Sequence, residues 1–499
     1  MLRQTVMAGG MILAGAIPLF AQHDDRIDVV APFEVLSFEP STSGFIFTRM
    51  GIAETLVNAA PDGTLTPGLA IAWTVSEDRL TWLFSLRQNV SFHDGTPMTA
   101  ESVANALQIA AAKPGPLSDA PIVDIAVHDG GIAILLSESL AALPAYMAES
   151  RSMILSPASY DATGQGQQMI ATGPYRLTDF TPPNALSAEA FAAYWGDAPH
   201  ISHVSYQAVT RPETRALLAE SGDADFVFAL DPASVSRLGQ NPDLVVQSVA
   251  IPRTLLLKIN AGHPALAEPD ARRALSLAID RTGIAKAVLR YPEGAGQLFP
   301  PSAGDWHNDA LAPLAYDPAA AAALLSDLGW MKGSDGILTR DGERFALTLT
   351  TYPDRPEQPL VAAVLEQQLA AIGVAITIDS TNSSEIPARH QDGSLDLALL
   401  ARNFALIPDP VGTVLSDYAP GGDWGAMNWD NPAFTGLVQD IGRGESTDMA
   451  RATAILQDDL PVIPIAWYRQ TLVVPSNLNG VVIDPWERSF GLQDLEWAE

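Results

Sequence analysis

The segment between residues 345 and 400 alternates strand-like and helix-like stretches, and this order constrains the fold more than any other feature. Phe345 to Thr351 predicts a strand, and Pro359 to Ala371 predicts an amphipathic helix. Val374 to Ile378 and Asp396 to Leu400 predict two more strands. Because strands joined through helices form sheets that those helices cover, the order predicts an α/β fold.

The rest of the chain also mixes helices and strands. We predict a helix over Thr48 to Leu56, ending near Asn58, and a second helix that Thr99 caps at its N-terminus. Gly95 and Gly173 are predicted to occupy turns with unusual backbone angles. Further strands are predicted at Ile27–Ala31, Trp73–Val75, Trp82–Leu86, Ile122–Val127, Ile132–Leu136 and Pro461–Val474, and further helices at Pro269–Ile279 and Pro318–Leu328.

Length and charge bound the possible functions. The chain has 499 residues, enough for two or three domains, and 47% of them are hydrophobic, which supplies their cores. Asp and Glu number 58 against 28 Lys and Arg, so the net charge is −30, which argues against a nucleic-acid partner. Cysteine is absent, which removes disulfides, cysteine-ligated metals and an acylated-cysteine anchor.

Residues 1–21 have the pattern of a secretory signal peptide. Arg3 precedes an apolar stretch from Val6 to Phe20, which is shorter than the roughly 20 residues of a bilayer-spanning helix. A polar run follows from Gln22. We expect cleavage after Ala21 and a soluble periplasmic protein without a lipid anchor.

Signatures of catalysis are missing from the sequence. It contains no G-x-S-x-G turn, no phosphate-binding G-x-x-x-x-G-K-[ST] loop and no H-E-x-x-H metal motif. The 8 histidines are scattered, and His200 and His203, which are close in sequence, have no third ligand nearby. We therefore expect no catalytic residue, no metal held by the protein alone and no cofactor; a secreted hydrolase is the weaker alternative.

A series of short motifs is spread along the chain. They are Thr66–Trp73, Leu80–Arg87, Val90–Pro97, Thr99–Val103, Thr172–Tyr175, Tyr194–Gly196, Gly222–Asp225, Arg272–Arg281, Tyr316–Pro318 and Leu324–Trp330. Each motif is weak alone, but their number and order over essentially the whole mature chain resemble the large substrate-binding proteins of ABC transporters, family 5, which comprises oligopeptide-, dipeptide- and nickel-binding types.

The resemblance implies a periplasmic-binding-protein-like α/β fold (type II, large class C) of two lobes joined by a hinge. Lobe I would span residues 22–254, with an extra subdomain inserted at about 58–180, and lobe II residues 255–465, with 466–499 returning to lobe I. The lobes would close on a small-molecule ligand, because ligand that contacts both of them stabilises the closed state. The implied partners are the permease and ATPase subunits of an inner-membrane ABC importer, and we expect a monomer.

Three arginines match the nickel- and metallophore-binding branch of the family. Arg151 stands where that branch places an arginine that pairs with carboxylates of a metal chelator, and Arg402 fits a second landmark. Arg355 lies within Tyr352–Pro359, a segment that also resembles this branch. A guanidinium suits the role because its planar fork binds a carboxylate through two N–H groups and stays charged. The alternative for Arg151 is an ordinary ion pair at the surface or between the lobes.

The segment that carries a metal-binding histidine in the nickel binder departs from that pattern. Tyr418 to Trp429 contains no histidine, and of two aromatic cleft positions Phe404 is kept while Pro408 replaces the other. The resemblance therefore implies a metal already wrapped in an organic chelator, which needs no protein histidine. The full predicted ligand set is Arg151, Arg355, Arg402, Phe404, Trp424, Tyr352, Phe45 and Thr42.

A di- or oligopeptide is the competing ligand. A peptide needs an acidic residue for its amino end, and Asp409 or Asp423 could supply one. The sequence leaves the metal chelate and the peptide open.

Overall fold

The computed structural model describes residues 25–353, 355, 357–420 and 422–498. The predicted signal peptide and its cleavage site lie outside these described residues. Within them, no helix combines the length and the apolar character that a bilayer crossing requires.

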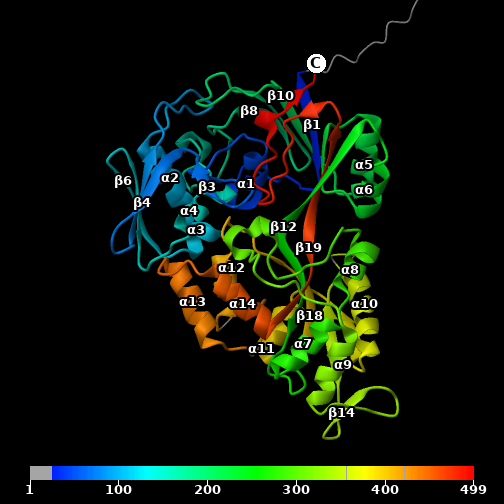
Figure 1. Cartoon of the computed structure of the whole chain (residues 1–499). Coiled ribbons are helices and arrows are strands. Elements are labelled where there is room, and N and C mark those ends of the chain that lie inside the picture. Colours follow the sequence, from blue (N-terminus) through cyan, green and yellow to red (C-terminus); the bar gives the residue numbers. More distant parts are fainter. Residues whose placement is uncertain (1–24, 354, 356, 421, 499) are drawn as a thin grey trace, which may run out of the picture.

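Two long antiparallel strands connect an upper and a lower half of the molecule (Figure 1). β12 (Leu244–Ile259) and β19 (Val462–Pro475) run from one half into the other and pair with each other. They belong to a 10-stranded sheet with the order β17-β16-β18-β12-β19-β11-β1-β10-β9-β8 in the described part of the chain. The predicted lobe boundaries at residues 254 and 465 fall within these two strands, and the boundaries themselves stay predictions.

The upper half is built on the strands at one end of this sheet. β1 pairs in parallel with both β10 and β11, and β9 and β8 follow β10 in antiparallel order. Their bounds are β1 Arg26–Ala31, β8 Tyr175–Thr181, β9 Ala185–Ala190, β10 His203–Ala208 and β11 Phe226–Phe228, with α1 Pro40–Arg49, α5 Pro212–Ser221 and α6 Pro232–Leu238 beside them. The C-terminal residues return to this half, where Phe490 and Leu495 join its core.

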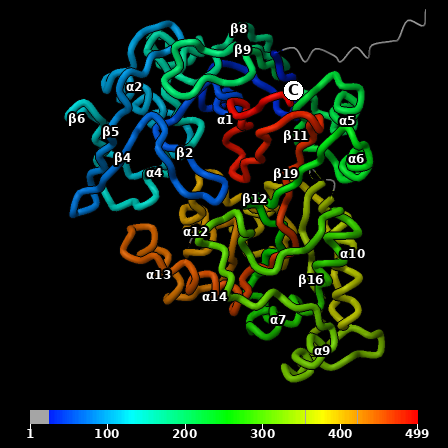
Figure 2. Tube along the Cα trace, turned by 45° about the horizontal axis from the view of Figure 1, so that its top comes forward, coloured from blue at the N-terminus to red at the C-terminus, as the bar shows by residue number. Residues whose placement is uncertain are grey.

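A smaller sheet stands beside the upper half (Figure 2). Its strands follow the order β4-β5-β7-β6, and α2 packs on β6 and β7. Trp82 and Phe84 of β5 lie in a hydrophobic cluster of this part. The bounds are β4 Ala70–Val75, β5 Thr81–Leu86, β6 Ile122–His128, β7 Gly131–Leu136 and α2 Ala100–Ala111, and Thr99 caps α2 as predicted.

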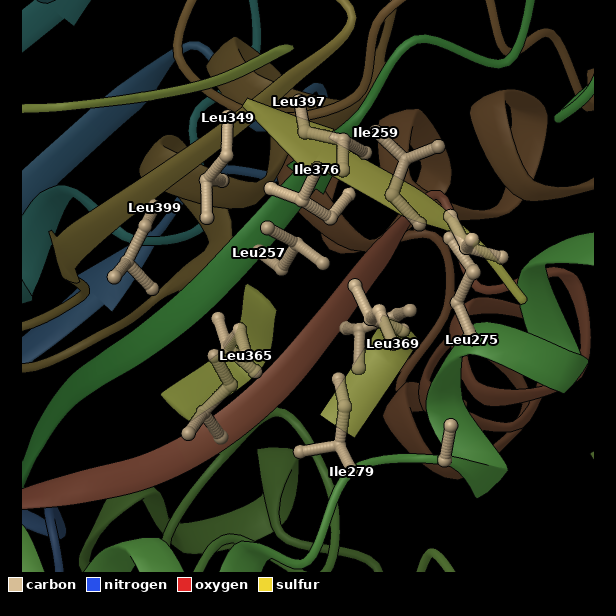
Figure 3. Packing of buried hydrophobic residues seen from close by; sticks show 14 of the residues in the cluster. Leu257, Ile259, Leu275, Ile279, Leu349, Leu365, Leu369, Ile376, Leu397 and Leu399 are labelled. Carbon is tan, nitrogen blue, oxygen red and sulfur yellow. The ribbon is translucent and has the colours of Figure 1, made fainter. Parts of the chain in front are cut away.

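The lower half carries the α/β pattern that the sequence predicts. β16 (Ala346–Thr351) pairs in parallel with β17 (Ala375–Ser380) and with β18 (Leu397–Asn403). α10 (Glu357–Ala371) covers this sheet, and Figure 3 shows its leucines among those of the strands. The fully buried side chains there are Leu257, Ile259, Leu275, Ile279, Leu349, Leu365, Leu369, Leu397 and Leu399.

The predicted helix over Thr48–Leu56 is wrong. The helix at this place is α1, which begins at Pro40 after the cap Glu39 and ends at Arg49. Gly51 follows with φ 66°, a left-handed conformation that a helix does not continue through. The apolar residues of 52–56 therefore belong to a turn and to a buried segment without a helix. The spacing of hydrophobic residues alone did not distinguish such a segment from a helix.

The two glycines singled out in the sequence have different roles. Gly95 has φ 82°, as predicted. Gly173 is not in a left-handed conformation; a Cβ there would lie 2.3 Å from the carbonyl oxygen of Gly51 and 2.6 Å from that of Ile52. Gly173 is thus needed because the backbone of residues 51 and 52 passes too close for a side chain at this position.

A second contact between the halves lies at the end of α13 (Pro432–Arg443). The amide N–H of Ala141 donates to the carbonyl oxygen of Gly442 at 2.8 Å. The carbonyl oxygen of Arg443 accepts from the Ser139 hydroxyl at 2.9 Å and from Arg79 Nη1 at 3.0 Å. The smaller sheet of the upper half thereby satisfies carbonyls that a helix C-terminus leaves without intrahelical partners. Two neighbouring helices of the lower half are α12 (Val411–Tyr418) and α14 (Met449–Asp459).

Replacing Gly444 by Ala is expected to lower the free energy of unfolding by about 1–2 kcal/mol, the cost of a left-handed conformation for a residue with a side chain. Gly444 has φ 73°, and a Cβ there would lie 2.7 Å from Arg79 Nη1. Urea unfolding measures the change. Gly436→Ala is the control and should not destabilise, because Gly436 lies inside α13, which Gly444 follows, and no atom lies within 4 Å of the place its Cβ would take. Equal losses for the two variants would contradict the prediction.

Candidate functional site

A cleft of about 590 Å³ lies between the two halves. The upper half lines it with the end of α1 and the turn after it, with the segment 148–151, and with the C-terminal segment 484–494. The lower half contributes Asn403, Ala405 and Leu406 at the end of β18, and Arg253 of β12. Arg253 lies one residue before the predicted end of lobe I, but it pairs with Asn403 of β18 and is therefore counted with the lower half. The described residues that line the cleft include no histidine.

An arginine and a glutamate form one wall of the cleft. Arg151 Nε lies 3.1 Å from Glu149 Oε1, and the backbone N–H of Arg151 donates to Glu149 Oε2 at 2.9 Å. The Arg151 side chain is 34% exposed, whereas that of Glu149 is 7% exposed. The buried Glu149 carboxylate therefore holds the Arg151 guanidinium, and part of the Arg151 side chain stays open to the cleft.

The C-terminal turn forms a second wall around Asp484. Its carboxylate accepts the backbone N–H groups of Trp486 at 2.8 Å, Arg488 at 2.7 Å and Ser489 at 3.1 Å, which fixes the turn. The Arg488 guanidinium donates to the carbonyl oxygen of Ala148, and burial lowers the pKa of Arg488 to about 10. This bond connects the turn to the segment that carries Arg151.

Four phenylalanine rings surround the guanidinium of Arg49 at the end of α1. Its Cζ lies 4.8 Å from the ring centre of Phe33, 5.2 Å from Phe45, and 5.9 Å from each of Phe228 and Phe490. Cation–π attraction offsets part of the cost of removing this charge from water. Phe45 thus lines the cleft and also holds a buried arginine.

Glu54 is a partly buried carboxyl group at the cleft. Tyr194 donates to its Oε1 at 3.0 Å, and Trp195 at 3.0 Å and Thr172 at 2.7 Å donate to its Oε2. Burial raises the pKa of Glu54 to about 7 in spite of these hydrogen bonds. Its charge therefore changes near neutral pH.

The structure places two of the eight predicted ligand residues, Arg151 and Phe45, on the cleft wall. The other six are also described and lie elsewhere. Arg402 makes a bidentate ion pair with Asp417, at 2.5 and 2.8 Å. Phe404 is fully buried, with its ring centre 4.9 Å from that of Phe299.

The remaining four predicted residues also have structural neighbours. Arg355 lies over the ring of Tyr468 at 5.2 Å, and Tyr352 is buried in the core of the lower half. Trp424 packs against that same core. The hydroxyl of Thr42 donates to the carbonyl oxygen of Glu39 at 3.2 Å, within the first turn of α1.

The two acids considered for a peptide's amino end lie outside the cleft as well. Asp409 accepts the backbone N–H of Val411 at 2.9 Å, and burial raises its pKa. Asp423 borders a separate hollow beside His390. Glu149, Asp484 and Asp494 are cleft acids that the sequence did not single out.

Several cleft residues escaped the sequence analysis. Arg49 and Glu54 fell inside the helix that was wrongly predicted there, and Arg253 lies in a strand that was not predicted. The turn from Asp484 to Ser489 did carry a signal, since a proline turn dense in charge and with a tryptophan follows the last predicted strand. No group of three or more His, Cys, Asp or Glu suited to a metal ion is found within the described part of the chain.

Comparison with known proteins places the chain in a family. The sequence model of the bacterial extracellular solute-binding proteins, family 5, matches residues 64–424. The chain belongs to this family. The resemblance read from the sequence motifs is thereby confirmed, and the family consists of substrate-binding proteins of ABC transporters rather than enzymes.

Two relatives of this family 5 protein have known ligands. The nickel-binding periplasmic protein of Escherichia coli K12 is 26% identical over 97% of this chain and 96% of its own length. The glutathione-binding protein GsiB of Salmonella typhimurium LT2 is 28% identical over 64% of this chain and 61% of its own length.

A solved structure confirms the predicted fold class. The nickel ABC transporter protein of Bacillus halodurans superimposes with a TM-score of 0.85 and 24% identity, covering 94% of this chain and 99% of that one. The fold is the α/β fold of the family 5 periplasmic binding proteins.

Proposed function

We propose that this family 5 protein is the periplasmic receptor of an ABC importer and that it carries a metal–chelator complex, with nickel as the metal. A signal peptide at residues 1–21 would direct it there, and the monomer would deliver its cargo unaltered to the permease. Membership of the family gives the chain a binding role, and a metal–chelator complex is the ligand class proposed for it.

The observation that carries the proposal is the composition of the cleft wall. It contains Arg49, Arg151, Arg253 and Arg488, and no histidine among the described residues. The wall also carries five acids, but a bare Ni²⁺ ion needs several ligands in a defined geometry, and no group of three or more His, Cys, Asp or Glu suited to a metal is found among the described residues. A chelated ion is already coordinated and presents carboxylates, which arginine binds well. The similarity to a nickel-binding protein over 97% of the chain supports nickel as the metal.

A peptide is the second candidate, favoured by the acids of the same cleft. Glu149, Asp484 and Asp494 would face the amino end of a short peptide, and one relative binds the tripeptide glutathione. Native mass spectrometry of protein purified from its source distinguishes the two ligands. A nickel isotope pattern with the mass of a chelator supports the metal complex, whereas a set of peptide masses contradicts it.

Replacing Arg151 by Ala is expected to weaken the binding of nickel complexes of EDTA, citrate or L-histidine by about 1.5–3 kcal/mol, the value of a hydrogen bond to a charged group. Isothermal titration calorimetry measures the dissociation constants. Arg176→Ala is the control, because Arg176 is an exposed arginine of β8 that pairs with Glu189 and does not line the cleft. An unchanged dissociation constant for Arg151→Ala would remove this residue from the proposed site.

A further inference from the structure

The two halves contribute very unequal charge to the cleft. The upper half supplies eight charged side chains to its wall, three arginines and five acids, and the lower half supplies Arg253 alone among the described lining residues. The other lining residues of the lower half are Asn403, Ala405 and Leu406. A ligand whose carboxylate is held by an upper-half arginine can therefore attract the lower half through one full positive charge, that of Arg253.

Arg253 lies where the pairing of the two connecting strands is interrupted. The register of β12 with β19 shifts between Ala250 and Thr254, and Pro252, which has no N–H, stands inside this stretch. Arg253 itself is opposite Asn403 of β18. Arg253 thus lies on a strand that connects the two halves, at a place where the pairing with β19 is irregular.

Glu487 of the upper half holds this guanidinium in place. Its Oε2 lies 3.0 Å from Arg253 Nη2, and its Oε1 lies 3.9 Å from Arg49 Nη2. The Glu487 residue has φ 57°, and its carbonyl oxygen accepts from Arg49 Nε at 2.5 Å. The backbone of Glu487 is thus bound to Arg49, and its carboxylate has Arg253 as the closer of its two guanidinium partners.

Three charged side chains meet at this place. Glu487 lies between Arg49 and Arg253, and Asp484 is a further negative group that attracts Arg49. The Arg253 side chain is 21% exposed and lines the cleft. A carboxylate from a ligand would form charge-assisted hydrogen bonds with the guanidinium of Arg253.

We propose that Arg253 is the ligand-contacting residue that couples binding to closure, and that Glu487 is the residue that positions it. The ligand class is a carboxylate-bearing small molecule, as in the proposed function on which this inference rests. Ligand shifts the equilibrium between open and closed states only by the contacts that differ between them. Upper-half residues hold the ligand in both states, and Arg253 contacts it only in the state in which the halves are close enough for the Arg253–Glu487 ion pair to form.

The test combines binding with a measurement of shape. Isothermal titration calorimetry gives the dissociation constant, and small-angle X-ray scattering gives the radius of gyration with and without saturating ligand. The probes are nickel–EDTA, nickel–L-histidine and glutathione. The variants are Arg253→Gln, Arg253→Lys and the control Arg344→Gln, an exposed arginine of the lower half that pairs with Asp335. Circular dichroism confirms that each variant is folded.

Arg253→Gln is expected to weaken binding of the probe 10- to 100-fold and to abolish the decrease in radius of gyration at saturating probe. Arg253→Lys keeps the positive charge but not the planar guanidinium, so ligand should compact this variant only partially. If Arg253→Gln does not fold, Arg253→Lys takes its place in the test. Arg344→Gln should match the wild type. A variant Arg253→Gln that binds and compacts like the wild type overturns the inference and leaves the metal proposal standing.

The probes separate this inference from the proposed function. Compaction by glutathione that depends on Arg253, without binding of the nickel complexes, supports the inference and contradicts the metal cargo. A wild-type protein that none of the probes compacts overturns both.

Discussion

Replacing Arg402 by Ala is expected to lower the free energy of unfolding by about 3–5 kcal/mol, the range for removing one partner of a buried ion pair. Asp417 is 1% exposed and accepts two hydrogen bonds from the Arg402 guanidinium. Without that guanidinium a buried carboxylate loses its principal partner. Guanidinium chloride unfolding, followed by tryptophan fluorescence, measures the loss.

Two further variants show whether the ion pair is the cause. Arg402→Leu combined with Asp417→Leu should recover most of the lost stability, because replacing both partners by apolar groups leaves no buried charge unpaired. Arg344→Ala, which breaks an exposed ion pair with Asp335, should cost under about 1 kcal/mol. A folded and fully stable Arg402→Ala variant with weakened ligand binding would restore Arg402 as the ligand residue that the sequence predicted.

Glu54 is expected to make the protein less stable as the pH rises from about 4.5 to about 7. Burial raises the pKa of Glu54 from 4.5 to about 7, so the folded chain retains a proton that the unfolded chain has lost in this window. The folded state then binds more protons, and the free energy of unfolding falls with rising pH. The expected decrease from this one group is about 2–3 kcal/mol.

The variant Glu54→Gln isolates this contribution from that of the other carboxylates. Glutamine resembles the protonated carboxyl, since its amide can donate to the Tyr194 hydroxyl and its oxygen can accept from Trp195 and Thr172. Urea unfolding at pH 4.5, 6 and 7.5 should show the wild type losing about 2–3 kcal/mol relative to Glu54→Gln across this range. Parallel pH dependence in the two proteins would contradict the raised pKa.

The lower half could be predicted from its local pattern. Its strands and α10 carry hydrophobic residues at the periods of a buried strand and of a helix, and these residues do form the core there. β12 was missed because Pro252 interrupts a strand of 16 residues, which local rules take as the end of a strand. Here pairing with β18 and β19 maintains the strand on both sides of the proline.

The candidate site shows the same division. Arg151 lines the cleft as the family resemblance suggested, whereas Arg402 is separated from it by its pairing with Asp417, 15 residues away in the sequence. The neighbouring residues in the sequence do not show which of these two arginines faces the cleft, because both stand among ordinary polar and apolar residues. The distance of each guanidinium from a carboxylate depends on how the chain packs.

The sequence by itself determined the α/β class and the family, because both depend on short-range periodicity and on motifs of neighbouring residues. Only the tertiary structure decided which charged side chains face the cleft. Arg49, Arg253 and Glu487 come from segments separated by more than 200 residues, and they meet because β12 and β19 bring the two ends of the chain together. Contacts of that kind depend on long-range packing, which residue type and spacing do not encode locally.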